Sequence, residues 1–147
     1  MDRKGVTLIE IIVVLAIIAL TATLAVPSIA AWMPNYRLRT AARDLLSTLR
    51  NAQMKAVSTN TEHRVLFSGP EGAYIVQRRT TGGTWVDDET VQRVPTGVRF
   101  HQINLAGDIA EFNPNATSSA GNVILKNNKG REKKIVLFSA TGRVRIE

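Results

Sequence analysis

The chain has 147 residues, of which 44% are hydrophobic and 21% charged, and its net charge is +7 from 19 Lys and Arg against 12 Asp and Glu. This length and composition are typical of a single folded domain, and they exclude a disordered chain and a large multidomain enzyme. Because the sequence contains no cysteine, disulfides, thiolate nucleophiles and cysteine metal sites are excluded as well.

Residues 6–26 form an apolar stretch of 21 residues that carries one charge, Glu10. A helix of this length spans about 31 Å, close to the thickness of the hydrocarbon core of a bilayer. The short basic leader before it would hold the N-terminus in the cytoplasm. The long apolar run and the lack of a good cleavage site after it favour a retained membrane helix over a secretory signal peptide.

Glu10 is unusual because a carboxylate inside an apolar span costs several kcal/mol unless it is paired. One interpretation is that the side chain reaches the lipid headgroups, since it lies near the start of the stretch. The other is that it needs a cation, for which Arg3 and Lys4 are the nearest candidates in the chain.

The residues from Lys4 to Glu10 read KGVTLIE and run directly into the apolar stretch. This pattern resembles the N-terminus of type IV prepilins and type II secretion pseudopilins. The resemblance implies that a prepilin peptidase cleaves after Gly5 and that Val6 becomes N-methylated. It also implies that Glu10 pairs with the N-terminal amine of a neighbouring subunit in a filament.

The same resemblance suggests how the chain is organised. Residues 1–5 would be the cleaved leader, residues 6–34 the transmembrane and assembly helix, and residues 35–147 a soluble pilin-like domain. The protein would be a single-pass protein of the inner membrane with its C-terminal domain in the periplasm. From there it would be incorporated into a pilus or pseudopilus.

A second helical pattern follows two prolines, Pro27 and Pro34, which are expected to bend a helix. Apolar residues then recur at intervals of three or four up to about residue 58, which predicts an amphipathic helix whose apolar stripe packs on a sheet. The stripe consists of Leu38, Ala41, Ala42, Leu45, Leu49, Ala52 and Ala56.

After residue 60 the pattern changes to short runs with a period near two, separated by turn residues, which is typical of β-strands. The predicted strands cover residues 64–67, 73–79, 85–94, 98–103, 109–112, 122–126, 131–138 and 143–146. The runs on either side of residues 127–130 read as a hairpin. The predicted fold class is therefore α+β, with one long N-terminal helix and a β-rich domain packed on its C-terminal half.

The strings EFNPNAT at residues 111–117 and SATGRVRI at residues 139–146 are similar to the GspH/FimT family of minor pseudopilins and minor pilins. The resemblance implies a β-sandwich of two small antiparallel sheets on a long helix. It also implies a structural subunit of a type IV pilus or type II secretion filament, in a tip or initiation complex. Its partners would be other major and minor pilins or pseudopilins.

The residues that could carry catalysis form no convincing site. Asp87, Asp88 and Glu89 are consecutive, so their side chains are expected to point apart in a solvated turn. His63 and His101 belong to no triad or metal-binding pattern and are read as structural or surface residues. We therefore expect no enzyme, no cofactor and no metal site, and a membrane-bound hydrolase has little support.

The last 22 residues hold most of the excess charge, with seven basic and two acidic residues. On a strand, Arg143 and Arg145 would share one face about 6.6 Å apart, close to the ~6.8 Å rise of two nucleotides along one DNA strand. Basic residues of the hairpin could extend this surface: Lys126, Lys129, Arg131, Lys133 and Lys134. No aromatic residue interleaves them, so phosphate contact is indicated and base stacking is not.

The string Gly142-Arg143-Val144-Arg145 also resembles the tail of FimT-type minor pilins, which is implicated in DNA binding during natural transformation. Double-stranded DNA is therefore a candidate partner. Two other interpretations stay open, an edge strand protected by charge and a contact to another minor subunit. In the alternative function, the chain is an H-type minor pseudopilin of type II secretion, which serves protein export without binding DNA.

Overall fold

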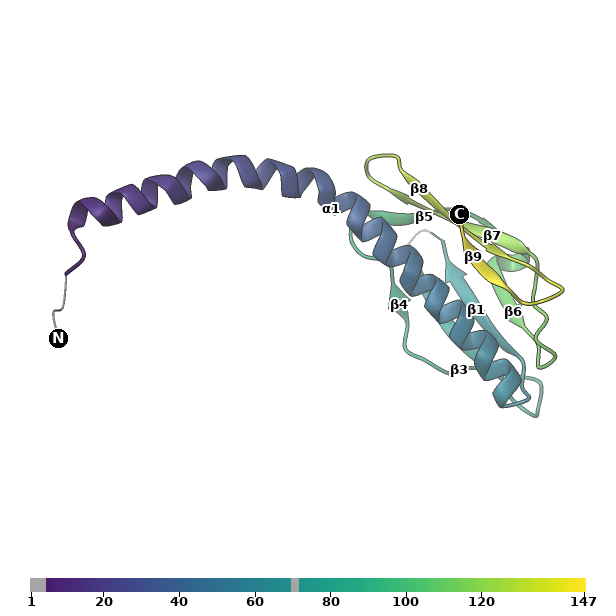
Figure 1. The fold of residues 1–147 in the computed structure, drawn as a ribbon. Helices are drawn as coiled ribbons and strands as arrows, with labels where there is room; N and C mark the ends of the chain where they lie inside the picture. Colours follow the sequence, from purple (N-terminus) through teal and green to yellow (C-terminus); the bar gives the residue numbers. More distant parts are fainter. Residues whose placement is uncertain (1–4, 70–71) are drawn as a thin grey trace. The chain divides into compact units, whose positions relative to one another are not determined.

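The computed structural model describes residues 5–69 and 72–147, except for the side chains of residues 24–28 (Figure 1). One long helix, α1, covers Leu8–Ser58 and is continuous through the positions of both prolines. Among the residues that the structure describes, nine strands and a short 3-10 helix, Ala106–Asp108, follow it. The strands are β1 (His63–Ser68), β2 (Ala73–Arg79), β3 (Trp85–Asp87), β4 (Gln92–Arg93), β5 (Val98–Asn104), β6 (Ile109–Phe112), β7 (Gly121–Asn127), β8 (Glu132–Leu137) and β9 (Val144–Ile146).

The chain divides into two compact units, the first ending at Met33 and the second covering Pro34–Glu147. In the first unit, the helix exposes its large apolar side chains over residues 8–20. Those that are at least 47% exposed between residues 8 and 20 are Leu8, Ile9, Ile11, Ile12, Val13, Val14, Leu15, Ile17, Ile18 and Leu20. Such a surface is unfavourable in water, which indicates that other apolar groups cover it in the working protein.

Within residues 5–69 and 72–147, no helix combines the length and the hydropathy that crossing a membrane requires. The membrane span expected over residues 6–26 is therefore not confirmed. The side chains of residues 24–26, at the end of that stretch, lie outside the described residues.

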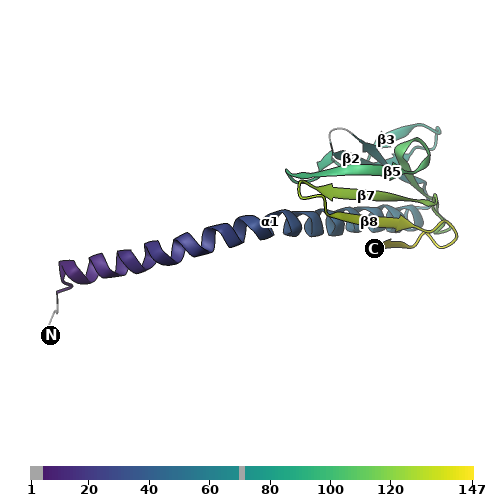
Figure 2. The same cartoon turned by 90° about the horizontal axis from the view of Figure 1, so that it is seen from above.

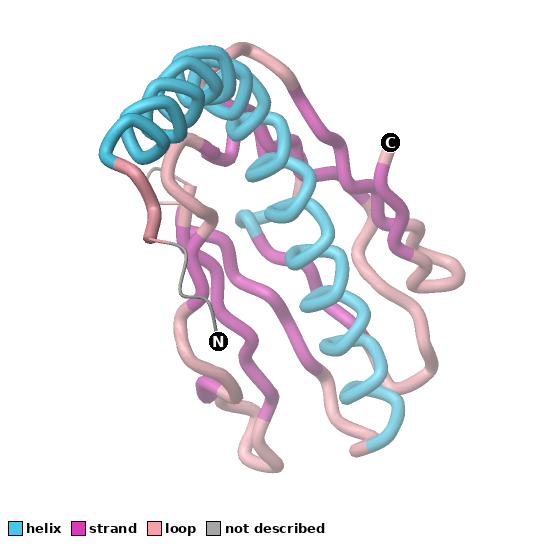
Figure 3. Tube along the Cα trace, turned by 60° about the vertical axis from the view of Figure 1, so that its left-hand side comes forward, coloured by secondary structure: helices cyan, strands magenta, loops and turns pink. Residues whose placement is uncertain are grey.

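In the second unit, α1 packs through the apolar stripe that its sequence predicts. All seven predicted stripe residues are buried, and Leu45, Leu49, Ala52 and Ala56 are fully so. The views in Figures 2 and 3 show this part of α1 running alongside the strands. The spacing of three and four residues thus places one continuous apolar face of the helix against the sheets.

The strands form two antiparallel sheets. The first has the order β3-β2-β1-β6, with β4 also paired to β2, and the second has the order β5-β7-β8-β9. Alternating side chains of both sheets join the helix stripe in one hydrophobic core. The predicted α+β sandwich of two small antiparallel sheets with a long helix is therefore confirmed.

One predicted strand is wrong. Residues 85–94 form two short strands, β3 and β4, rather than one. The chain leaves the sheet at Asp88 and Glu89 because both carboxylates bind Lys55 on α1. This connection therefore lies against the helix, where the sequence suggested a single strand interrupted at residues 87–89.

Candidate functional site

The start of α1 is capped by a threonine of the predicted processing motif. The backbone N–H of Glu10 donates a hydrogen bond to Oγ1 of Thr7, at 3.3 Å. This bond satisfies one of the free amides at the start of the helix, and the carboxylate of Glu10 places a negative charge near the positive end of the helix. Sequence reasoning missed this role of Thr7, although a threonine three residues before a glutamate is a known signal of a helix start.

Gly5 and Val6 precede α1 in a segment without regular secondary structure, and both are exposed. Glu10 is exposed too, and it is the one ionisable side chain between residues 5 and 23. The helix therefore presents an apolar surface with a single carboxylate in its first turn. This arrangement suits helix-to-helix packing in which the carboxylate meets a cation from another chain.

The C-terminal strand β9 alternates as its sequence predicts. Val144 is buried and Ile146 packs against the core, whereas Arg143 and Arg145 are exposed. The guanidinium of Arg145 binds the carboxylate of Glu147. Arg143 makes no ion pair with any residue that the structure describes, so it is the arginine of this tail that can accept a new anionic partner.

The other predicted basic residues do not all add to this surface. Lys126 pairs with Glu132 at 2.9 Å, which lowers the pKa of that carboxyl. Lys134 lies 3.9 Å from Glu147, beside Arg145. Lys133 is half-buried, and Lys129 and Arg131 lie in the exposed turn between β7 and β8. The structure thus brings Lys134 to the tail and leaves Lys126 largely neutralised.

Two helix residues hold the tail in place. Nε2 of Gln53 donates hydrogen bonds to the carbonyl oxygens of Ala116 and Thr141, at 3.4 and 3.2 Å. Nη2 of Arg50 donates one to the carbonyl oxygen of Val144, at 3.3 Å. These partners lie 63 to 94 residues apart in the chain, so no local pattern in the sequence could indicate them.

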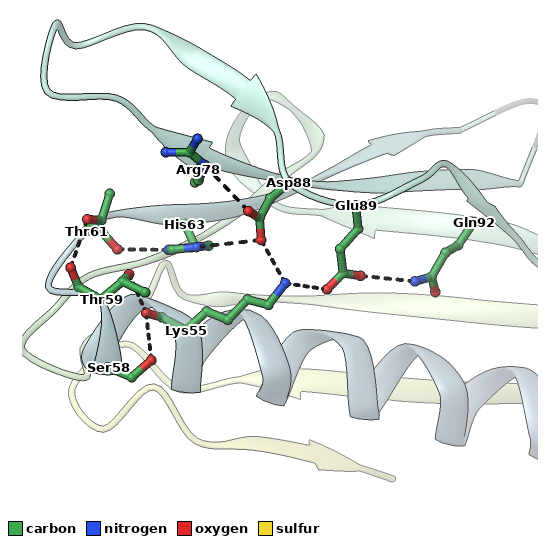
Figure 4. Close-up of polar contacts among 9 residues, drawn as sticks. All are labelled: Lys55, Ser58, Thr59, Thr61, His63, Arg78, Asp88, Glu89 and Gln92. Carbon is green, nitrogen blue, oxygen red and sulfur yellow. Dashed lines mark hydrogen bonds and ion pairs between the residues drawn. The ribbon is translucent and has the colours of Figure 1, made fainter.

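A cluster of charged residues lies at the other side of the helix (Figure 4). Nζ of Lys55 donates to Oδ2 of Asp88 and Oε1 of Glu89, each at 2.7 Å. Asp88 also lies 3.5 Å from Nε of Arg78 and 3.9 Å from Nε2 of the buried His63. The expectation that Asp88 and Glu89 point apart into solvent is wrong, because the helix supplies a cation between them.

We call this cluster the clamp, because its contacts are structural; it consists of Lys55, His63, Arg78, Asp88 and Glu89. Nδ1 of His63 donates a hydrogen bond to the carbonyl oxygen of Thr61, at 2.9 Å, and its Nε2 faces Asp88, so the ring is held on both sides. Glu89 accepts a further hydrogen bond from Gln92. Within the described ranges, no three acidic or histidine side chains are grouped so that they could hold a metal ion. The clamp joins the β3–β4 connection to α1.

The clamp makes stability depend on pH at both extremes. The hydrogen bond from Lys55 lowers the pKa of Asp88 below 3.8, and the bonds to Asp88 and Glu89 raise the pKa of Lys55 above 10.5. A lowered carboxyl pKa adds stability above pH 3.8 that is lost as the pH falls below it. A raised lysine pKa adds stability below pH 10.5 that is lost as the pH rises.

We expect Lys55→Met to lower the free energy of unfolding by about 1 kcal/mol near neutral pH, since the pair is partly exposed. Denaturant unfolding should show this difference shrinking as the pH falls below 3.8, where Asp88 becomes protonated. Arg79→Met, which removes the more exposed pair with Glu62, is the control and should cost less. Equal losses for both variants at every pH would contradict a specific role of the clamp.

Comparisons with known proteins agree with this geometry. Residues 1–26 match the prokaryotic N-terminal methylation motif. Residues 41–142, more than half of the chain, match the family described as type II transport protein GspH. No curated protein matches the sequence significantly.

Two solved structures share the fold. The minor pseudopilin EpsH from the type 2 secretion system of Vibrio cholerae superposes with a TM-score of 0.63 at 9% identity, over 76% of this chain and 96% of that one. The type IV minor pilin FimU of Pseudomonas aeruginosa strain PAO1 gives 0.61 at 16% identity, over 77% and 90%. At these identities the likeness shows a common fold for the chain.

Proposed function

Because the chain belongs to the GspH family of type II transport proteins, we propose that it is a minor pilin or pseudopilin that joins a filament through its N-terminal helix. The observation that carries this proposal is the exposed apolar surface of α1 between Leu8 and Leu20, with one carboxylate in its first turn. Neighbouring helices of the same kind would cover this surface. The protein is then a structural subunit rather than an enzyme.

The methylation motif at residues 1–26 supports processing before assembly. A prepilin peptidase would cleave after Gly5, which is exposed and lies outside the helix. Val6, then N-methylated, would start the mature chain, and Glu10 would bind the N-terminal amine of a neighbouring subunit. Until assembly, the apolar stretch over residues 6–26 would anchor the chain in the inner membrane, with the C-terminal domain in the periplasm.

We expect Glu10→Gln to reduce incorporation into the filament by at least about tenfold, because a neutral amide cannot compensate a buried amine. The measurement is the fraction of tagged full-length protein that co-purifies with its filament or tip complex from the native host. Mass spectrometry of the N-terminus should show that the variant is still cleaved after Gly5. An uncut wild-type chain would contradict the proposal itself.

Thr7→Val is the matched control. It removes the hydroxyl that caps the helix but keeps the carboxylate, so incorporation should stay within about twofold of wild type, since loss of a cap costs only about 1 kcal/mol. If Thr7→Val fails as severely as Glu10→Gln, Glu10 acts through the helix cap rather than through its charge.

We further propose that the exposed tail contacts the phosphates of double-stranded DNA, as in uptake for natural transformation. The supporting observation is that Arg143 is exposed and has no ion-pair partner in the described part of the chain, with the exposed Arg145 two residues on and Lys134 near the end of the same strand. Glu147 offsets part of their charge, and Lys126 is engaged by Glu132. The contact would thus be small, sequence-independent and sensitive to salt.

We expect Arg143→Ala to weaken binding of the full-length protein, in detergent, to a labelled DNA duplex by about three- to tenfold at low salt. The slope of log K against log salt should decrease by about one. Arg99→Ala is charge-matched and lies on β5, at the opposite edge of the same sheet, so it should have little effect. Equal effects of both variants would indicate general charge attraction.

The alternative is an H-type minor pseudopilin that serves type II secretion without DNA. In that case β9 would be a charged edge strand or a contact to another minor subunit. If wild type binds no duplex even at low salt, this alternative becomes the leading account, while the role in the filament is unchanged.

A further inference from the structure

A groove of about 280 Å³ lies beside the start of β9. Its lining residues are Phe138, Ala140, Thr141, Arg143 and Arg145. Phe138 is 43% exposed, although the ring would gain by burial. The expectation that no aromatic residue interleaves the basic ones is wrong, because Phe138 lies between Lys134 and Arg143 in the chain. The fold brings them together.

The groove is held rigidly by its backbone. The N–H of Phe138 donates to the carbonyl oxygen of Arg143 at 3.0 Å, and Oγ of the buried Ser118 donates to the carbonyl oxygen of Phe138 at 3.4 Å. Nε2 of Gln53 holds Thr141 on the opposite wall. The backbone that carries the ring is therefore fixed, so a ligand that stacks on this aromatic platform need not order the loop first.

The charges around this platform are positive. Arg143 is free of ion pairs within the described residues, and Arg145 shares Glu147 with Lys134. A ring that lies beside an unpaired guanidinium matches a ligand with a planar apolar face and an adjacent anion. A nucleotide has both, since every base offers a stacking face and every linkage a phosphate.

We propose that this groove binds an unpaired nucleobase of single-stranded DNA, with the base stacked on Phe138 and its phosphate on Arg143. The proposal rests on the proposed DNA contact of the tail, and it adds the stacking of a base to the contact with a phosphate. Bases inside a duplex are stacked on one another and cannot reach the ring. Strand ends, gaps and single strands offer the base that the groove needs.

The test compares two fluorescein-labelled oligonucleotides of equal length and charge, oligothymidine and an abasic strand, on the full-length protein in detergent. We expect wild type to bind oligothymidine about tenfold more tightly than the abasic strand. Phe138→Leu should abolish this preference and leave the abasic affinity unchanged. Phe138→Trp should keep the preference, which shows that the platform rather than the particular ring is required.

Arg143→Ala should weaken binding of both strands, and Val91→Ala, at an apolar position that is 55% exposed outside the groove, should change neither. If wild type binds both strands equally well, the stacking proposal is overturned while the phosphate contact stands. A preference that survives in Phe138→Leu overturns it too. If neither strand nor duplex binds at low salt, the proposed DNA contact fails and this inference fails with it.

Discussion

Replacing Leu49 with alanine is expected to lower the free energy of unfolding of the second unit by about 2–5 kcal/mol. Leu49 is fully buried and lies at the centre of the stripe by which α1 packs on the sheets. Removal of its branched end leaves a cavity between elements that cannot collapse onto one another without moving the helix. Urea unfolding of the full-length protein in detergent, followed by near-ultraviolet circular dichroism, measures the loss.

Met54→Ala is the control on the same helix. Met54 is 60% exposed, so its truncation should change the free energy of unfolding by no more than about 0.5 kcal/mol. If both variants lose the same stability, the helix is held by something other than the buried stripe.

Replacing Gly142 with alanine should be the second largest effect, a loss of about 2–3 kcal/mol. The residue has a φ of +59°, and an added Cβ would lie 2.3 Å from the carbonyl oxygen of Ala116 and 2.3 Å from Nε2 of Gln53. The carbonyl oxygen of Ala116 cannot move aside without disturbing the hydrogen bond that it accepts from Gln53. The same variant should also weaken DNA binding, because Arg143 follows directly.

Gly130→Ala separates the cost of the positive φ from the cost of the close contact made by the added Cβ. Gly130 also has a positive φ, +81°, but no atom lies within 4 Å of its added Cβ. This variant should lower the free energy of unfolding by about 1 kcal/mol, the cost of placing alanine at a positive φ. If Gly142→Ala is no worse than Gly130→Ala, the close approach to Ala116 does not constrain the tail.

The parts of the fold that the sequence predicted are those with local, repeated signals. The helix stripe from Leu38 to Ala56 is visible because its period is short and its residues are strongly apolar. The residue range of β2 and that of β6 agree with the prediction, and the other strands, apart from β3 and β4, differ by one or two residues at their ends. Turn residues bound these runs closely, which explains the accuracy.

The misses come from contacts that the sequence pattern does not show, some of them between residues far apart in the chain. Asp88 and Glu89 read as a solvated turn until Lys55, 33 residues earlier, is placed between them. The sequence predicts Phe138 only as the last residue of a strand, but the turn that follows places it beside Arg143. The roles of Glu10 and the tail in assembly depend on other chains, and they remain predictions.

The contacts of Gln53 and Arg50 with the tail also set an order of events during synthesis. The helix that carries them is made early, whereas Thr141 and Val144 follow 88 and 94 residues later. Loop closure over such separations is slow compared with helix formation. Val144 belongs to the core, so the domain closes only when these late residues dock. A nascent chain therefore keeps its second sheet incomplete until translation has almost finished.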